Sequence, residues 1–213
     1  SLTNGYASTQ AVSGASGTSM SIYINTDNGV TFNGVSSVTT ADVVASNGIV
    51  HIVDSVIGLP TVVTFAVADP NFEILVQALT RDDLTMDFVG LLNSSTSPPT
   101  PLTVFAPVNN AFVNLLDELG LNGLNDIDEP TLSAVLTYHV VTGANQLSIN
   151  LSDGMEFTTA GGGALLFNFG DNGEGILTDN NGRTSNIVAV DVQANNGIIP
   201  VSYTHLTLPT IRS

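Results

Sequence analysis

The sequence contains neither cysteine nor lysine nor tryptophan, and its 3 basic residues are all arginine. Without cysteine there can be no disulfide framework, no thiolate metal site and no cysteine nucleophile. No stretch approaches the roughly 20 consecutive apolar residues that a membrane span requires. Several large classes of protein are excluded before any motif is considered.

Positive charge is scarce, with 19 acidic residues against 3 basic ones and a formal net charge of -16. Proteins that bind nucleic acid or anionic lipid neutralise phosphates with clustered Lys and Arg, so neither is expected as a partner. Strong acidity favours solubility and opposes nonspecific association. The remaining polar residues are mostly Ser, Thr, Asn and Gly, which is typical of secreted bacterial surface proteins. We therefore expect an exported protein.

An internal repeat organises the chain. The segment TADVVASNGIV (Thr40–Val50) aligns with AVDVQANNGII (Ala189–Ile199), and the same offset places LTNG (Leu2–Gly5) on LSDG (Leu151–Gly154). One constant offset serves every pair, so residues 1–50 are predicted to be a second copy of residues 150–199. Because the unit is about the size of a domain, this pattern indicates tandem duplication rather than a solenoid.

Short strands are predicted within both copies. Residues 21–24, 164–169 and 185–190 are apolar or alternating runs bounded by Gly, Asn and Asp. Asp-Asn-Gly at 27–29 and 171–173, and Asn-Asn-Gly at 180–182, tolerate the positive φ angles of tight turns. The pattern indicates β-hairpins.

The middle of the chain is predicted to be helical. Asp69 and Pro70 begin a helix with an Asp cap and a proline in the first turn. Asn109 or Asn110 is expected to cap a second helix that stops at Gly120, and residues 131–141 form a third. Residues 93–101 (NSSTSPPTP) are expected to form an exposed loop.

Three ordered motifs then resemble a known family. TVFAPVNNAF (Thr103–Phe112), VLTYHVV (Val135–Val141) and a closing NGI at Asn196 follow one another with the order and spacing of the fasciclin domain. The resemblance implies an α+β fold, a sandwich-like wedge of antiparallel β-strands flanked by short α-helices. Residues 61–200 would be one such domain lacking its last strand, and residues 1–60 the C-terminal part of a preceding one. We expect the sequence to be an excerpt of a longer protein.

The segment after Pro200 is predicted not to be native. VSYTHLTLPT is the translation of GTC TCT TAT ACA CAT CTG ACG CTG CCG ACG, which resembles a transposase adaptor used in shotgun sequencing libraries. Residues 201–213, with their Tyr203, His205 and Arg212, are therefore excluded as site candidates. An uninterrupted genomic read through these codons would end this hypothesis; the alternative is a divergent strand, since Val201 to Leu208 contains β-formers.

The resemblance also implies which residues carry the family's motifs, as structural positions or partner contacts. His51 and Asp54 belong to NGIVHIVDSVIGLP, the closing strand of the first copy, and Tyr138–His139 form the family's Tyr-His pair. In animal relatives the region around this pair is associated with integrin binding, but for this chain we expect a buried His139 ring hydrogen-bonded to backbone. The full set is Thr103, Val104, Phe105, Ala106, Pro107, Asn109, Phe112, Tyr138, His139, Asn47, Gly48, His51, Asp54, Asn196 and Gly197.

Catalytic and metal sites are not predicted. The loop DNGEGILTDNNG carries Asp171, Glu174 and Asp179, for which a weak calcium site is the alternative to ordinary turn chemistry. Two acidic groups, Asp82–Asp83 and residues 126–129, are interpreted as helix caps rather than a glycosidase pair. No nucleophile elbow, phosphate loop or dinucleotide fingerprint is present, and no cofactor is expected.

Together these features predict a non-catalytic adhesion or interaction module of a bacterial protein that is extracellular, at the cell surface or periplasmic. Its partner would be an extracellular protein or polysaccharide, and homophilic contact is open. An extracellular polysaccharide-acting enzyme and a passive spacer in a larger surface protein are the alternatives. The expected core residues are Phe105, Phe112, Leu136, Tyr138 and Val140.

Overall fold

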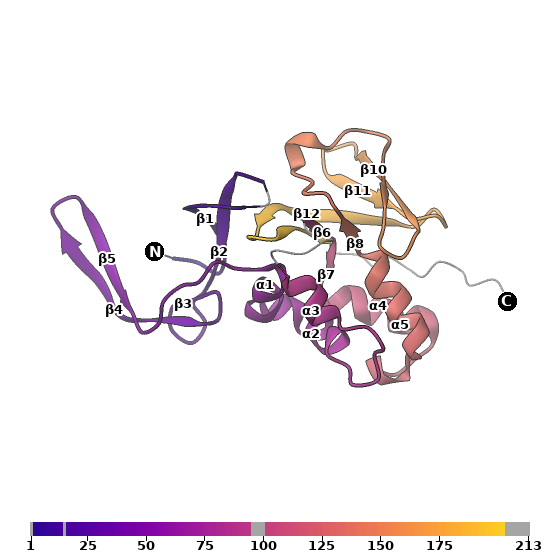
Figure 1. The fold of residues 1–213 in the computed structure, drawn as a ribbon, viewed down its shortest axis with the longest axis horizontal. Coiled ribbons are helices and arrows are strands. Elements are labelled where there is room, and N and C mark those ends of the chain that lie inside the picture. Colours follow the sequence, from indigo (N-terminus) through magenta and orange to yellow (C-terminus); the bar gives the residue numbers. More distant parts are fainter. Residues whose placement is uncertain (1, 15, 95–100, 203–213) are drawn as a thin grey trace.

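A computed structural model describes residues 2–14, 16–94 and 101–202 (Figure 1). The first 60 residues form an antiparallel meander in which each strand pairs with the next along the chain. Its strands are β1 (Gly5–Val12), β2 (Ser19–Asn25), β3 (Thr31–Phe32), β4 (Ser36–Ala45) and β5 (Gly48–Val53). The long hairpin of β4 and β5 projects away from the rest of the protein, at the left of Figure 1.

Short helices fill the middle of the chain and gather on one side of the second sheet (Figure 1). They are α1 (Val62–Ala68), the 3-10 turn η1 (Pro70–Phe72), α2 (Glu73–Leu79), α3 (Phe88–Asn93), α4 (Asn109–Leu119), η2 (Leu124–Asp126) and α5 (Glu129–Tyr138). No single described helix has the length and apolarity to cross a membrane. The segments 62–68 and 70–79 meet that test only when joined, and they are bent by 98° at the break.

The second sheet has the strand order β8-β6-β13-β12-β11-β10-β9, with β7 also pairing with β13. β6 and β7 run parallel to β13, and the other pairs are antiparallel. A further 3-10 turn, η3 (Ser148–Asn150), precedes β9. The strand bounds are β6 (Leu102–Val104), β7 (Ala106–Pro107), β8 (Val140–Thr142), β9 (Met155–Thr158), β10 (Ala164–Phe169), β11 (Gly175–Thr178), β12 (Thr184–Gln193) and β13 (Gly197–Ser202).

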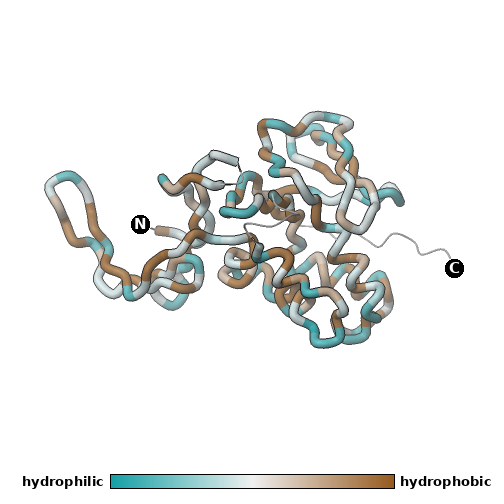
Figure 2. Tube along the Cα trace, in the orientation of Figure 1, coloured by the Kyte–Doolittle hydropathy of each residue, from teal (hydrophilic) through white to brown (hydrophobic). Residues whose placement is uncertain are grey.

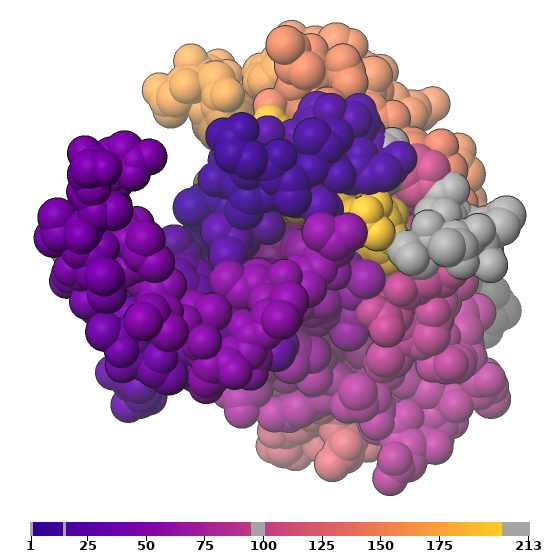
Figure 3. Space-filling view, turned by 60° about the vertical axis from the view of Figure 1, so that its left-hand side comes forward, coloured from indigo at the N-terminus to yellow at the C-terminus, as the bar shows by residue number. Residues whose placement is uncertain are grey.

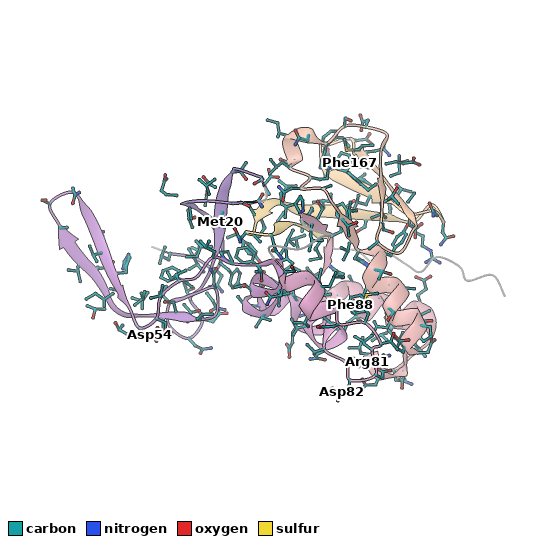
Figure 4. All side chains as sticks on the ribbon, in the orientation of Figure 1. Met20, Asp54, Arg81, Asp82, Phe88 and Phe167 are labelled. Carbon is teal, nitrogen blue, oxygen red and sulfur yellow. The ribbon has the colours of Figure 1, made fainter. Side chains whose placement is uncertain are left out.

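Two apolar clusters form the core. The larger one joins the helices to the sheet and includes Phe88, while the smaller one lies among β9–β12 and includes Phe167 (Figure 4). Val104 and Ala106 belong to the first cluster and Phe105 between them belongs to the second, because neighbouring side chains along an extended strand point to opposite faces. The expected core is confirmed, since Phe105, Phe112, Leu136, Tyr138 and Val140 are all buried.

The predicted strands and turns are confirmed at residues 21–24, 164–169 and 185–190, which lie in β2, β10 and β12. Each predicted turn holds a glycine with positive φ, at Gly29, Gly173 and Gly182. Of the loop predicted at 93–101, Asn93 ends α3 and residues 95–100 lie outside the described part of the chain.

Of the first two predicted helix starts, one is confirmed and the other is wrong. The Asp69 carboxylate caps η1 by accepting from the Asn71 N–H at 3.0 Å, as expected, although the first turn is 3-10 and α2 follows it. The expected Asn109 cap is wrong. Val108 is the N-cap of α4, and the Asn109 amide instead accepts from the Ile74 N–H and donates to the Pro70 carbonyl, each at 2.9 Å, which ties α4 to the start of α2.

The third helix ends earlier than predicted, because residues 140–142 extend into β8 beside β6. Its start agrees with the cap hypothesis, since the Asp128 carboxylate accepts from the Thr131 N–H at 2.9 Å. For Asp83 that hypothesis is wrong. Its carboxylate makes a salt bridge of 2.6 Å with Arg81 instead of capping a helix.

The expectation that the second unit lacks its last strand is also wrong for the chain as written. β13 continues through Pro200 to Ser202, and the Val201 side chain is buried. Ile199 pairs with Val192 and Val201 with Ala189, so Pro200 lies opposite a bulge where no ladder N–H is needed. Residues 203–213, including Tyr203, His205 and Arg212, lie outside the described residues.

Candidate functional site

The turn between β12 and β13 is the best-connected polar feature among the family-motif residues. The Asn196 amide oxygen accepts from the Val62 N–H at 3.0 Å, at the start of α1. Its amide nitrogen donates to the carbonyls of Leu92 at 2.8 Å and Ser94 at 2.9 Å, at the end of α3. One side chain, 1% exposed, thus hydrogen-bonds backbone groups at two helix termini, where the helix itself leaves such groups unpaired.

Gly197 follows and allows a close approach between strands. A Cβ at this position would lie 2.3 Å from the Leu102 carbonyl oxygen on β6. Only glycine avoids that overlap, so the parallel pairing of β13 with β6 depends on it.

Gln193, at the end of β12, joins the first unit to the second, although it lies outside the family motifs. Its backbone N–H donates to the Ser21 hydroxyl at 3.0 Å, and its amide nitrogen donates to the carbonyls of Ala194 at 2.7 Å and Gly197 at 2.8 Å. The residue is 1% exposed. Its repeat counterpart is Val44, so the only signal in the sequence was a polar residue replacing an apolar one between the copies.

Tyr6 forms a second link between the units. Its hydroxyl donates to the Asp69 carboxylate at 2.9 Å, and its ring packs against Tyr23 and Phe65 with centroid distances of 5.0 and 5.5 Å. Burial, together with the negative charge of Asp69, raises the pKa of Tyr6. The same two causes raise the pKa of Tyr23 to about 12. Both phenols therefore stay neutral in ordinary buffers.

The Tyr-His pair ties α5 to the sheet. The Tyr138 hydroxyl donates to the Ala164 carbonyl on β10 at 2.6 Å, and burial raises the pKa of Tyr138. His139 caps α5, and its Nδ1 donates to the Val135 carbonyl at 2.8 Å. These contacts fit the structural role expected for the pair.

His139 carries one unused polar atom. Its Nε2 is buried and has no hydrogen-bond partner among the described residues. The ring lines a small apolar cavity of about 30 Å³ beneath α1 and α2. Burial lowers the pKa of His139 to about 4, so the ring is neutral at pH 7.

Three motif residues of β6 and β7, Val104, Ala106 and Pro107, line the same cavity. Residues 102–108 are all buried, and Thr103 is wholly inaccessible. The Thr103 hydroxyl donates to the Ala144 carbonyl at 2.9 Å and accepts from the Gln146 N–H at 3.0 Å, while the Phe105 N–H donates to the His139 carbonyl at 2.9 Å. Phe112 packs in the larger apolar cluster.

The corresponding residues of the first copy lie apart from these. Asn47 and Gly48 are exposed at the tip of the β4–β5 hairpin, and Asp54 is exposed at its base (Figure 4). The Asp54 carboxylate accepts from the Ser37 N–H at 2.8 Å, and His51 Nδ1 accepts from the Asp42 N–H at 3.3 Å. The tertiary structure therefore brings the second-copy motifs together and leaves the first-copy motifs exposed on the projecting β4–β5 hairpin.

The acidic residues are used in turns and caps. Asp179 accepts from the N–H groups of Asn181 at 2.8 Å and Arg183 at 2.9 Å, and Glu174 accepts from the Asn172 N–H at 3.0 Å. Across residues 2–14, 16–94 and 101–202, no group of three or more His, Asp or Glu side chains is placed to hold a metal ion. The carboxylates of Glu174 and Asp179 thus make hydrogen bonds within the turns of this loop.

The other acidic groups also have hydrogen-bond partners. Hydrogen bonds from Arg81 to Asp83, from the Thr131 N–H to Asp128 and from the Thr85 N–H to Glu129 lower the pKa of each carboxyl. A glycosidase general acid needs a raised pKa, whereas the pKa values of these three carboxyls are lowered.

The sequence and the fold now identify the family. The family model of the Fasciclin domain matches residues 1–60 and 70–202. The chain belongs to the fasciclin domain family. The uncharacterized protein sll1735 of Synechocystis sp. (strain ATCC 27184 / PCC 6803 / Kazusa) is 33% identical over 147 residues, which are 67% of this chain and 94% of that protein.

A second relative agrees with this membership, and a solved structure shares the fold. Protein sll1483 of the same Synechocystis strain is 30% identical over 141 residues, which are 66% of this chain and 69% of that protein. Among solved structures, a FAS1 domain pair from the insect cell adhesion molecule fasciclin I matches with a TM-score of 0.60 at 21% identity, covering 94% of this chain and 66% of that one. This likeness shows that the fasciclin chain shares the FAS1 fold.

Proposed function

We propose that this fasciclin chain is a non-catalytic adhesion or interaction module of an exported bacterial protein. The observation that carries the proposal is the family membership over residues 1–60 and 70–202, supported by the likeness to a domain pair from a cell adhesion molecule. The bacterial source is supported by the two Synechocystis relatives.

The joint between the units supports a role in presenting surfaces. Tyr6 contacts Asp69, the Gln193 N–H contacts Ser21, and the Ser13 hydroxyl donates to the Ala194 carbonyl at 2.9 Å. Because these contacts are buried or half-buried and lie at separate points of the meander, they hold it against the second sheet. A fixed joint presents two surfaces in a set orientation, which suits an adhesion module.

The surface chemistry defines the class of partner. A chain with 19 acidic and 3 basic residues repels polyanions and offers carboxylates and amides to neutral or basic surfaces. Extracellular proteins and neutral polysaccharides fit this surface, and contact between copies of the chain is a further candidate. The lowered carboxyl pKa values of Asp83, Asp128 and Glu129 do not suit these three residues to the general-acid role of a polysaccharide-acting enzyme.

One experiment separates adhesion from its alternatives. The purified chain is applied to immobilised neutral glycans and matrix proteins, chain-coated beads are mixed with one another, and reducing ends released from the same glycans are measured. Saturable binding or bead clustering without sugar release is expected. Sugar release would establish the enzyme instead, and the absence of both binding and clustering would favour the passive spacer.

A further inference from the structure

A groove of about 240 Å³ lies at the joint between the first unit and the second. Its polar lining comes from Asn4, Tyr6 and Tyr23 of the first unit and from Asp69 and Asn71, which follow α1. In Figure 3 the meander, in indigo, lies against the closing strands of the second sheet, in yellow. The groove therefore exists only because the two units are packed together.

Asp69 brings a buried negative charge to this groove without a cationic partner. The residue is 5% exposed and directly follows α1, which is a hydrophobic segment in Figure 2. Its carboxylate accepts hydrogen bonds from neutral donors, namely the Tyr6 hydroxyl and the backbone and side-chain amides of Asn71. Among the described residues no Arg or His lies within salt-bridge distance of Asp69. A buried carboxylate is normally paired with a cation, so this one is an exception.

The surroundings of Asp69 favour positive charge. Asp69 ends α1, whose last turn contains no basic residue, and the C-terminus of a helix carries a partial negative charge that attracts cations. Burial and the charge of Asp69 raise the pKa of both Tyr6 and Tyr23, so the two phenols remain neutral beside it. Neutral tyrosine rings are themselves favourable neighbours for a cation.

The rest of the groove is mostly apolar. Val108, Val188, Ala189 and Val201 line it, and Val188 is 50% exposed. Lysine and arginine side chains pack their aliphatic stems along apolar surface while the charged head makes polar contacts. A groove with valines along it and a buried carboxylate therefore matches a side chain of this kind.

We propose that this groove binds the side chain of a lysine or arginine that a partner protein presents. The cationic head would pair with Asp69 beside the tyrosine rings, and the stem would lie along the valines. The inference rests on the proposed adhesion function and narrows its partner to a protein with an exposed basic residue. The formal net charge of -16 attracts such a partner at long range.

The repeat indicates that β1, which carries Tyr6, stays at a sheet edge when helices cover the sheet. Leu2–Gly5 aligns with Leu151–Gly154, so Tyr6 corresponds to Met155 of β9. β9 is the edge strand of the second sheet, although helices gather on one side of that sheet. Because methionine replaces the tyrosine there, the groove is a feature of the joint and not of every copy.

The test uses Nα-acetyl-lysine methylamide and Nα-acetyl-arginine methylamide as probes, with the Nε-acetylated lysine compound as the neutral analogue. Binding to the whole chain is followed by nuclear magnetic resonance of the Gly5, Tyr6 and Asn71 amides. Saturable shifts are expected with both cationic probes. The neutral analogue, which has the same stem but no charge, should bind about tenfold more weakly or not at all.

Two variants and a matched control locate the binding. Asp69→Asn removes the charge but keeps an oxygen acceptor and a good helix cap, and it should weaken binding of the cationic probes about tenfold. Val188→Trp should abolish binding by filling the groove from a half-exposed position, without any change of charge. Asp54→Asn is the control, because the exposed Asp54 carboxylate also accepts a backbone N–H, from Ser37 at 2.8 Å, but lies on the projecting hairpin. It should leave the affinity unchanged.

Equal affinity for the cationic probes and the neutral analogue would overturn the proposal. Unchanged affinity in a folded Asp69→Asn variant or in Val188→Trp would do the same. Adhesion to matrix proteins that persists undiminished in Asp69→Asn would also count against the groove, while leaving the proposed adhesion function intact. Probe binding that depends on Asp69, in a chain that adheres to no surface, would support the groove and contradict the adhesion function instead.

Discussion

Asn47-Gly48-Ile49 and Asn196-Gly197-Ile198 are the same three residues in the same turn, yet they have opposite environments. The first set is exposed at a projecting tip, whereas Asn196 and Ile198 of the second are 1% and 0% exposed. Local sequence determined the hairpin in both cases. The helices and strands that pack on it determined whether those residues contribute to stability. Matched substitutions in the two hairpins test this conclusion directly.

The largest contrast is expected for isoleucine. Ile198→Ala should lower the free energy of unfolding by about 2–5 kcal/mol, because it removes a fully buried side chain and leaves a cavity. Ile49→Ala, at a position 60% exposed, should stay within about 0.5 kcal/mol. Urea unfolding of both variants measures the difference. Equal losses would mean that Ile49 is also covered in solution.

The buried ring of His139 should make the folded protein less stable at low pH. Since burial lowers the pKa of His139 to about 4, the unfolded state binds a proton between about pH 6.5 and 4 while the folded state does not. The stabilisation is fully present above pH 6.5 and is lost as the pH falls to 4, amounting to about 3 kcal/mol.

The control for this pH effect is His139→Asn, which keeps a donor for the Val135 carbonyl without a titrating ring. Unfolding free energies of both proteins are measured from pH 7 to pH 4, and the original chain should lose about 3 kcal/mol more than the variant. Parallel pH profiles would contradict the assignment. The β13 amides should lose exchange protection on acidification before those of β5 change.

The two turn asparagines should differ next. Asn196→Ala removes three hydrogen bonds to backbone groups at α1 and α3, which should destabilise the protein by about 2–3 kcal/mol. Asn47→Ala, at the exposed tip, should change the urea midpoint little. A comparable loss in both variants would show that the tip of the first hairpin makes contacts of its own.

The smallest contrast concerns glycine. Gly197→Ala places a Cβ 2.3 Å from the Leu102 carbonyl oxygen and should cost about 1–3 kcal/mol through displacement of β6. Gly48→Ala meets nothing within 4 Å and should be close to neutral. Thermal unfolding of the pair is sufficient to compare them. A neutral Gly197→Ala would show that β6 can shift without loss.

Much of the fold could be predicted because its signals are local. The repeat offset, the Asn-Gly turns and the Asp69 and Asp128 caps each depend on a few adjacent residues. The errors arose where distant segments compete for the same atoms. Asn109 was predicted to cap its own helix but binds Ile74 and Pro70 instead, and residues 140–142 leave the helix because β6 offers them a strand partner.

The candidate site shows the same division. The motif residues of the second copy were found from their order along the chain, whereas Gln193 was missed because no motif marks it. Its hydrogen bonds reach Ser21 and Gly197, and a residue that joins two units has no local pattern of its own. Among the described residues, the His139 Nε2 atom has no hydrogen-bond partner. This too could not be predicted from the sequence, because it depends on residues distant along the chain.

By itself, the sequence determined the strands, the turns, the duplicated hairpin and the family of this protein, because turn chemistry and hydrophobic periodicity act between residues close along the chain. Only the tertiary structure decided which hairpin is buried, which asparagine hydrogen-bonds two helix ends and which glycine is required for close strand pairing. Those properties depend on residues 61–142, which pack against β13 and leave β5 free. Whether a residue is buried depends on the segments that pack against it as much as on its own side chain.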